Sequence, residues 1–251
     1  MKINVKNVSI PSIAPVLLIL TGLFFQPAAR FLANADYDVQ HFLRGDRTFS
    51  NDLFLVYIDS QEVEELGGWP ITRDYYGYLI YVLKQAGAKV IALNVLLPTK
   101  DQRYPEFDRD LVHFARTAGN VIAPFAYRQL SDRINKNGTV YLLGSEPQHP
   151  FDELDAQLLS TGFSNLADET VTRHALVAAW QDSVVSSFGL ECARHFLLGE
   201  QSTMQINKKR IILESDSAKV AVPIDNHQKM RLNQIKNLHR IPSMSLVDLF
   251  Q

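Results

Sequence analysis

The sequence predicts an α/β domain with a central, mostly parallel mixed sheet that is flanked by helices. Short apolar runs alternate with amphipathic segments, and a glycine follows each of the first two amphipathic segments of the domain core. Alternation at this spacing favours right-handed crossovers and parallel strand pairing. A longer uncharged segment near the N-terminus adds a transmembrane or signal-anchor helix to this fold.

The N-terminal segment has the charge pattern of an exported protein. Residues 13–25 are uncharged, with two lysines before them, and a lone arginine, Arg30, followed by two aspartates after them. Positive charge ahead of an apolar run favours a cytoplasmic N-terminus and an exported remainder. Flanking apolar residues extend the run, so we expect an uncleaved transmembrane anchor over residues 1–30.

Two other interpretations of this segment stay open. The uncharged run is shorter than the roughly 20 residues that a spanning helix needs. Ala33, Asn34 and Ala35 also resemble a small-x-small cleavage site, and both features suit a secretory signal peptide. A buried core helix of a cytosolic protein is disfavoured by the terminal position of the run and by its flanking charges.

The remainder, residues 31–251, is predicted to be one extracytoplasmic domain, because no Pro-, Gly- or Ser-rich linker divides it. Its first element is a juxtamembrane amphipathic helix over residues 31–45, which Gly45 ends as a C-terminal cap. The apolar side of this helix is formed, at helical spacing, by Phe31, Ala35, Val39 and Phe42.

Strands and helices alternate in the first half of the domain. Two short apolar runs, at residues 53–58 and 90–97, predict buried strands. Residues 72–86 and 107–117 each have one apolar face and are followed by a glycine, which predicts helices. A third strand is expected at residues 121–125.

The second half adds strands, some of them antiparallel, to the same sheet. Residues 128–150 are polar and irregular in pattern, which predicts a surface insertion. Within it, an Asn-Gly pair predicts a hairpin turn between residues 133 and 143. We expect strands over residues 162–166, 175–180, 204–206, 210–213, 220–223 and 230–235, and helices over residues 184–198 and 243–250.

Composition and motifs argue against several classes of function. The net charge of −2 gives no reason to expect nucleic acid as a partner. The single cysteine, Cys192, allows no intramolecular disulfide and fits a small buried side chain on a helix. The sequence lacks a dinucleotide fingerprint, a phosphate loop, a nucleophile elbow and histidines at ligand spacing. We therefore expect no catalytic residues, no metal site and no cofactor.

A ligand site is expected at the carboxyl ends of the first two strands, where open α/β sheets bind small molecules. Asp59 follows the first strand, Asn94 lies in the second, and Arg73 begins the helix between them. A positive side chain at a helix N-terminus favours a small anionic or polar ligand. Two alternatives stay open: Asp59 caps the next turn, or Arg73 pairs with Asp59 in an internal network that binds nothing.

Several motifs occur in a fixed order along the chain: LFLVYID, GGWPITRD, QAGAKVIALN, FDRDLVHFARTAGNVIAP, TGFSNLADETVTR and a closing element at residues 245–249. Together they resemble the CHASE sensor domain of the second type, a family of extracellular sensors attached to cyclases and histidine kinases. The resemblance implies structural roles for Trp69, Pro70, Asp108, Asp168 and Arg173. We expect the Trp69 ring to be buried over the sheet.

The chain departs from the pattern of that family at two places. Asn94 stands where the family has an aspartate, and Glu169 with Thr170 replaces an acidic-glycine pair. If these positions bind ligand or shape a turn, that capacity is altered or lost here. The sequence stops at Gln251, about where further transmembrane helices and an output module follow in the family. We therefore expect either a fragment or a member without an output module.

The resemblance implies a membrane-anchored input domain of bacterial signal transduction, held at the inner membrane with its main domain periplasmic or extracellular. Its expected mechanism is a ligand-dependent shift between two packings of the domain. The expected partners are the membrane, a small ligand, and either a second copy of the chain or a membrane signalling protein. Two rival functions stay open: a periplasmic or secreted hydrolase that uses Asp59, and a membrane-bound adaptor without a ligand.

Overall fold

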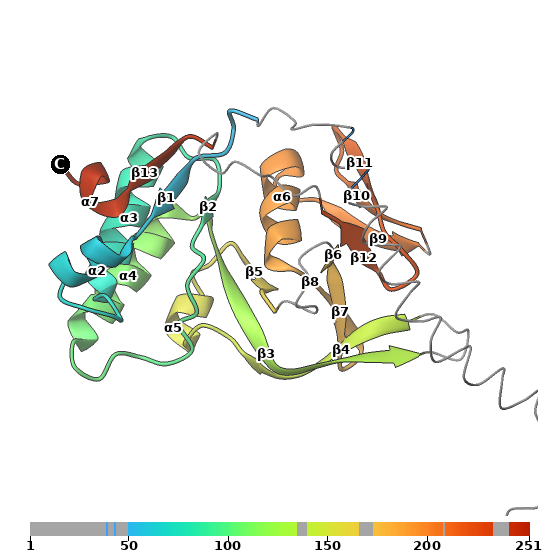
Figure 1. Cartoon of the computed structure of the whole chain (residues 1–251), viewed down its shortest axis with the longest axis horizontal. Coiled ribbons are helices and arrows are strands. Elements are labelled where there is room, and N and C mark those ends of the chain that lie inside the picture. Colours follow the sequence, from blue (N-terminus) through green and yellow to red (C-terminus); the bar gives the residue numbers. More distant parts are fainter. Residues whose placement is uncertain are drawn as a thin grey trace, which may run out of the picture. The chain divides into compact units, whose positions relative to one another are not determined.

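The computed structural model describes Val39, Leu43 and residues 50–134, 140–165, 173–207, 209–232 and 241–251. The chain divides into two compact units, residues 1–53 with 235–241, and residues 54–234 with 242–251. The helices and strands labelled in Figure 1 belong to the second unit.

The predicted N-terminal anchor over residues 1–30 lies outside the described residues. Of the predicted juxtamembrane helix, only Val39 and Leu43 are described, and both are helical. Within the described ranges, no helix combines the length and the apolar character that a bilayer span requires.

The first helices begin and end largely where the sequence predicts. Helices α3 (Arg73–Gln85) and α4 (Pro105–Ala118) confirm the two predicted helices. A proline starts α4, where its missing N–H leaves no bond unmade, and Gly119 ends the helix in the left-handed conformation at φ 66°. Two short helices were not predicted: α2 (Ser60–Glu65) and α5 (Asp152–Asp155).

The first two strands are shorter than predicted. Strand β1 covers only Leu55–Tyr57, and β2 covers only Ile91–Ala92. Among the described strands, β1 pairs with β13 (Ser243–Ser245) in parallel and not with β2.

The prediction that the first strand is buried is wrong. One side of β1 packs on the core through Val56, whereas Leu55 and Tyr57 on the other side are each 43% exposed. The two sides of a strand alternate along the chain, so an apolar run does not reveal how many of its sides the fold covers.

A six-stranded mixed sheet forms the centre of the unit. Its strands are β2, β3 (Val121–Ile134), β4 (Val140–Gln148), β5 (Ser160–Phe163), β7 (Val177–Trp180) and β8 (Ser183–Ser186). Strand β3 pairs in parallel with β2 and β5, and β4 pairs in parallel with β7. The pairs β3–β4 and β7–β8 are antiparallel. The predicted mixed α/β class is confirmed.

The strands β3 and β4 confirm the predicted hairpin and extend well beyond it. Their register runs from Ala126 opposite Gln148 to Ile134 opposite Val140. The prediction of an irregular insertion over residues 128–150 is therefore wrong. The polar side chains made this segment look irregular in the sequence, whereas its strand pairing is formed by backbone N–H and C=O groups. The Asn-Gly pair lies outside the described residues.

The remaining elements are β6 (Arg173–Ala175), β9 (Thr203–Asn207), β10 (Arg210–Glu214), β11 (Lys219–Pro223), β12 (Lys229–Arg231), α6 (Phe188–Leu198) and α7 (Leu246–Leu249). They do not extend the central sheet as predicted. Strands β9, β10 and β11 form a separate antiparallel sheet, and β6 pairs with β12. The helices predicted over residues 184–198 and 243–250 each begin as a strand, β8 and β13, and a serine then caps the shorter helix.

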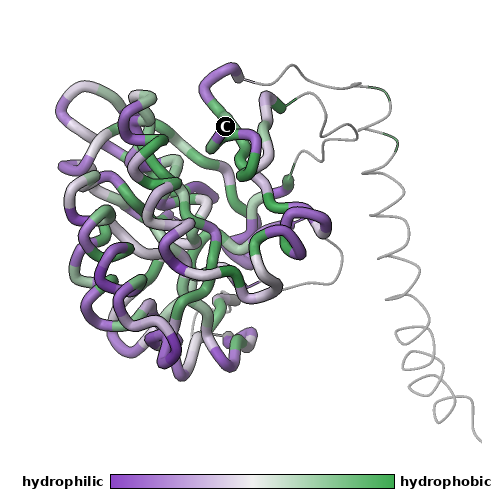
Figure 2. Tube along the Cα trace, turned by 90° about the vertical axis from the view of Figure 1, so that its left-hand side faces the viewer, coloured by the Kyte–Doolittle hydropathy of each residue, from purple (hydrophilic) through white to green (hydrophobic). Residues whose placement is uncertain are grey.

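Three clusters of buried side chains stabilise the unit. The first joins α3, α4, α5 and α7 to β2 and includes Ile80 and Leu111. The second surrounds Phe125 and Phe163 of the central sheet, and the third joins α6 to β9, β10 and β11 around Ile211. Figure 2 shows hydrophobic stretches along the inner strands and hydrophilic residues recurring along the outer turns of the helices.

Candidate functional site

Asp59 caps a helix. Its Oδ1 atom accepts hydrogen bonds from the backbone N–H groups of Gln61 and Glu62, at 2.8 and 2.9 Å. The Glu62 carboxylate accepts in return from the Asp59 N–H at 3.1 Å, which completes a capping box at the start of α2. The other Glu62 oxygen accepts from the Val247 N–H at 3.0 Å and ties α2 to α7. The capping alternative for Asp59 is therefore the one that the structure shows.

The three residues predicted to form the ligand site have separate positions. Asp59 belongs to the cap of α2, and Asn94 is exposed in the irregular segment after β2. Arg73 pairs with Asp108 of α4, so the alternative of an Arg73–Asp59 pair is wrong. The ligand-binding role of Asp59, Arg73 and Asn94 stays a prediction.

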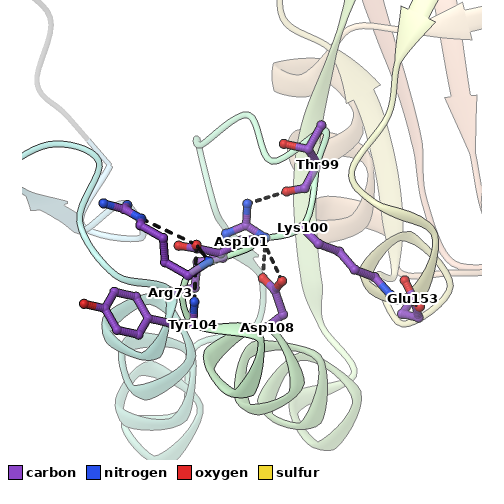
Figure 3. A network of polar contacts seen from close by, with 8 residues as sticks. Arg73, Thr99, Lys100, Asp101, Tyr104, Asp108 and Glu153 are labelled. Carbon is purple, nitrogen blue, oxygen red and sulfur yellow. Dashed lines mark hydrogen bonds and ion pairs between the residues drawn. The ribbon is translucent and has the colours of Figure 1, made fainter.

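Arg73 and Asp108 form a buried ion pair that joins three segments (Figure 3). Arg73 donates from Nη1 to Asp108 Oδ1 and from Nη2 to the backbone carbonyl of Thr99. The second oxygen of Asp108 accepts from the N–H of Asp101 at 2.8 Å. We call this arrangement the Arg73–Asp108 clamp, because it fastens α3, α4 and the loop at residues 98–104 to one another.

Two groups beside the clamp, Asp101 and Tyr76, have pKa values shifted from their ordinary values. The Asp101 carboxylate accepts from the N–H of Arg103 at 2.8 Å, and this bond holds the pKa of Asp101 below its ordinary value. Burial raises the pKa of Tyr76 to about 12, although the nearby Arg73 guanidinium acts in the opposite direction. The Arg73 guanidinium also lies over the Phe151 ring, 5.3 Å from its centre.

A pocket of about 360 Å³ lies against α4, with Asp108 in its wall. This volume is at the lower end of the range for small-molecule sites. Arg109, His113 and Arg116 follow one another at helical spacing on one face of α4. The full lining is Lys100, Pro105, Asp108, Arg109, Val112, His113, Arg116, Phe151 and Glu153.

The acidic side chains of the pocket are already paired. Asp108 belongs to the clamp, and Glu153 pairs with Lys100, whose hydrogen bond lowers the Glu153 pKa. None of the ion pairs of the described residues involves Arg109 or Arg116. The pocket therefore combines uncompensated positive charge with apolar side chains, which favours an anionic ligand.

The predicted structural residues have different outcomes. The expectation that the Trp69 ring is buried is wrong, because Trp69 is 67% exposed and Pro70 beside it is exposed as well. Arg173 pairs with Asp225 at 3.1 Å, which fits a structural role. Asp168 lies outside the described residues.

Two asparagines of the matched motifs connect neighbouring segments. Asn165 accepts from the backbone N–H of Tyr127 at 2.7 Å and donates to the carbonyl of the same residue at 2.8 Å. Asn120 donates to the carbonyl of Ala88 at 2.7 Å and so ties the start of β3 to the segment before β2. Both side chains complete backbone hydrogen bonding where regular pairing ends.

A second buried polar cluster, which the sequence analysis missed, lies on α6. Glu191 accepts hydrogen bonds from Arg194 at 2.6 Å and from Ser160 at 2.8 Å. Arg194 also donates to the Ser202 hydroxyl at 2.9 Å and lies 2.8 Å from Nε2 of His195. The signal in the sequence is the spacing of Glu191, Arg194 and His195, which places them on one helix face.

Burial and hydrogen bonding set the ionisation of this α6 cluster. Burial opposes the ionisation of Glu191, but the hydrogen bonds from Arg194 and Ser160 outweigh it and lower the Glu191 pKa. Burial lowers the pKa of His195 and raises that of Cys192 to about 12, which fits the predicted packing role of this cysteine. Across the described ranges, no three His, Cys, Asp or Glu side chains are grouped to hold a metal ion.

The family model of the CHASE2 domain matches residues 15–251, nearly the whole chain. Neither the curated proteins nor the solved structures give a match. CHASE2 domains are extracytoplasmic sensory domains of signal transduction, not catalytic ones. With a match of this extent, the chain belongs to the CHASE2 domain family.

Proposed function

We propose that this chain is the membrane-anchored input domain of a bacterial signalling protein and that it binds a small ligand in the pocket beside α4. Membership of a sensory family supports the signalling role. The charge pattern around residues 13–25 supports the anchor. The observation that carries the ligand site is that Asp108 belongs both to the pocket wall and to the Arg73–Asp108 clamp.

The shared residue gives ligand binding a route to the fold. Lys100 of the loop also lines the pocket, so a bound ligand contacts two of the segments that the clamp fastens. A ligand that binds one arrangement of this loop more tightly shifts the population toward it. Because the clamp fastens the loop to α3 and α4, the same shift changes how these two helices are held.

Thermal unfolding of the full chain in detergent, measured against a metabolite library, tests the ligand site. We expect some compounds to raise the melting temperature of the parent chain, and Val112→Trp to abolish that rise by filling the pocket. Val184→Trp, at an exposed position of β8, is the matched control and should keep the rise. A rise that survives Val112→Trp would place the ligand elsewhere.

A reporter fusion tests the topology. Alkaline phosphatase fused after Gln251 should be active, because the proposed anchor exports everything that follows it. The companion fusion carries a reporter that works only in the cytoplasm, and it should be inactive. The reverse pair of results would refute the extracytoplasmic placement of this chain.

A further inference from the structure

The cations of the pocket are distributed along α4 and are not gathered at one point. Arg109 and Arg116 are seven residues apart, so the helix rise separates their backbones by about 10 Å. His113 lies between them on the same face, and Val112 and Phe151 add apolar surface. The pocket thus presents two arginines on either side of an apolar middle.

A further cation comes from the loop at residues 98–104. Lys100 pairs with Glu153, and both side chains are more than half exposed. Ion pairs as exposed as this contribute little, because water and salt screen them. Lys100 can therefore exchange Glu153 for an anion in the pocket at small cost.

We infer that the pocket binds a small organic dianion whose two carboxylate or phosphodiester groups lie at opposite ends of a short apolar body. One anionic group pairs with Arg109 and the other with Arg116, while the apolar body packs on Val112 and Phe151. The inference rests on the proposed function, since it names the ligand class of that pocket.

The charge arrangement disfavours the other simple ligand classes. A cation meets repulsion from both arginines, and a neutral compound gains nothing from their charge. A monoanion compensates only one of two guanidinium groups about 10 Å apart along the helix. Carboxylate and phosphate suit these positions because the guanidinium fork donates two parallel hydrogen bonds to either group.

Isothermal titration of the full chain in detergent tests this inference with three probes of similar length. These are adipate, an α,ω-alkanediol bis(methyl phosphate) with one charge on each phosphodiester group, and hexanoate as the monoanion. At least one of the two dianions should bind about tenfold more tightly than hexanoate. Preference for adipate or for the bis(methyl phosphate) then identifies the anionic group.

Variants locate the binding. Arg109→Gln and Arg116→Gln should each weaken binding of the preferred dianion by about tenfold or more. Arg210→Gln, at an exposed position of β10 that lines no part of this pocket, is the matched control and should bind as the parent does.

Three results would overturn the inference: hexanoate binding as tightly as the dianions, parent-like binding in both pocket variants, or no binding of either dianion across a series of chain lengths. None of these results by itself contradicts the proposed function. A neutral or cationic metabolite whose stabilisation is lost in Val112→Trp would leave the sensory role standing and remove the dianion as its ligand.

Discussion

The Arg73–Asp108 clamp and the α6 cluster are both built on a buried arginine–carboxylate pair, yet they connect very different parts of the chain. Arg73 and Asp108 are 35 residues apart and belong to two helices. Glu191 and Arg194 are three residues apart on a single helix. The first pair also fastens a loop, whereas the second reaches β5 and the residues before β9 through bonds to Ser160 and Ser202.

The comparison separates two possible causes of stability: how deeply a carboxylate is buried, and whether its ion pair joins segments that are far apart along the chain, which we call connectivity. Asp108 and Glu191 are nearly equally buried, at 4% and 6% exposure. If burial alone set the cost of losing a carboxylate, the two sites would respond alike. Because the ion pair of the clamp itself joins two helices, whereas the Glu191–Arg194 pair lies within one helix, we expect the loss of the clamp to cost more.

The largest loss of stability is expected from Asp108→Ala. This change leaves the Arg73 guanidinium without its carboxylate partner and removes the acceptor of the Asp101 N–H. Breaking a buried ion pair from one side costs about 3–5 kcal/mol. Urea denaturation of the full chain measures the free energy of unfolding. Asp110→Ala, at an exposed position of the same helix, is the matched control and should stay within about 0.5 kcal/mol of the parent.

A double replacement distinguishes the cost of the unpaired Arg73 charge from the cost of lost side-chain packing. Arg73→Met combined with Asp108→Leu removes both charges and keeps apolar volume, so it should recover much of the loss. A parent-like stability of Asp108→Ala would show that the clamp contributes little to the fold, and the comparison with α6 would collapse.

A smaller loss is expected from Glu191→Gln, which keeps the shape of the side chain but weakens its bond to Arg194. Arg194 retains its bonds to Ser202, so less is left unpaired than at the clamp. We expect a loss of about 1–3 kcal/mol in the same urea measurement. Asp108→Asn is the like-for-like variant of the clamp, and a loss in Glu191→Gln that equals that of Asp108→Asn would show that burial, not connectivity, sets the cost.

The α6 cluster should also make stability depend on pH through His195. Burial lowers its folded-state pKa below the ordinary 6.5, so the unfolded chain binds the proton more readily. The contribution of His195 is therefore fully present above about pH 6.5 and is lost as the pH falls through its folded-state value.

His195→Gln should flatten the fall of stability below pH 6.5, by at most about 1.4 kcal/mol per pH unit. Urea denaturation at a series of pH values measures this slope. Burial lowers the pKa of His174 as well, so His174→Gln should remove a separate part of the same slope. An unchanged slope in His195→Gln would mean that this imidazole titrates alike in the folded and unfolded chain.

The smallest effect is expected at Trp69, which belongs to neither region. With its side chain 67% exposed, Trp69→Ala should cost less than about 1 kcal/mol. Tyr76→Ala, at a 3% exposed position of α3, should cost about 3 kcal/mol or more. Melting temperatures of the two variants give the comparison, and equal shifts would show that the Trp69 ring is covered in solution.

Local chemistry explains which elements could be predicted. The two main helices end at Gly87 and Gly119, both of which adopt positive φ, and a glycine after an amphipathic run is visible in the sequence. The hairpin was predicted from an Asn-Gly pair, which is likewise visible in the sequence as a turn signal. The motif order that suggested the CHASE family likewise needs no three-dimensional information, and the domain match confirms it.

Long-range pairing explains what could not be predicted. No local pattern indicates that β1 pairs with a strand near the other end of the described chain, or that Arg73 selects Asp108. The sequence left Asp59 with two interpretations, a ligand contact or a cap, and the capping-box spacing of Asp59 and Glu62 favours the cap. The helical spacing of Arg109, His113 and Arg116 is also visible in the sequence. The sequence does not show that these residues line a pocket, so it did not single them out.

The exchange of one backbone proton, the Asp101 N–H, reports how often the clamp opens. The N–H of Asp101 donates to the Asp108 side chain and not to a helix or a strand ladder. Such a proton exchanges with deuterium when the side chain moves away, without any unfolding of α4. The amides inside α4 report the opening of the helix itself. The ratio of the two exchange rates would therefore show how often this loop detaches from Asp108 while the helices stay folded.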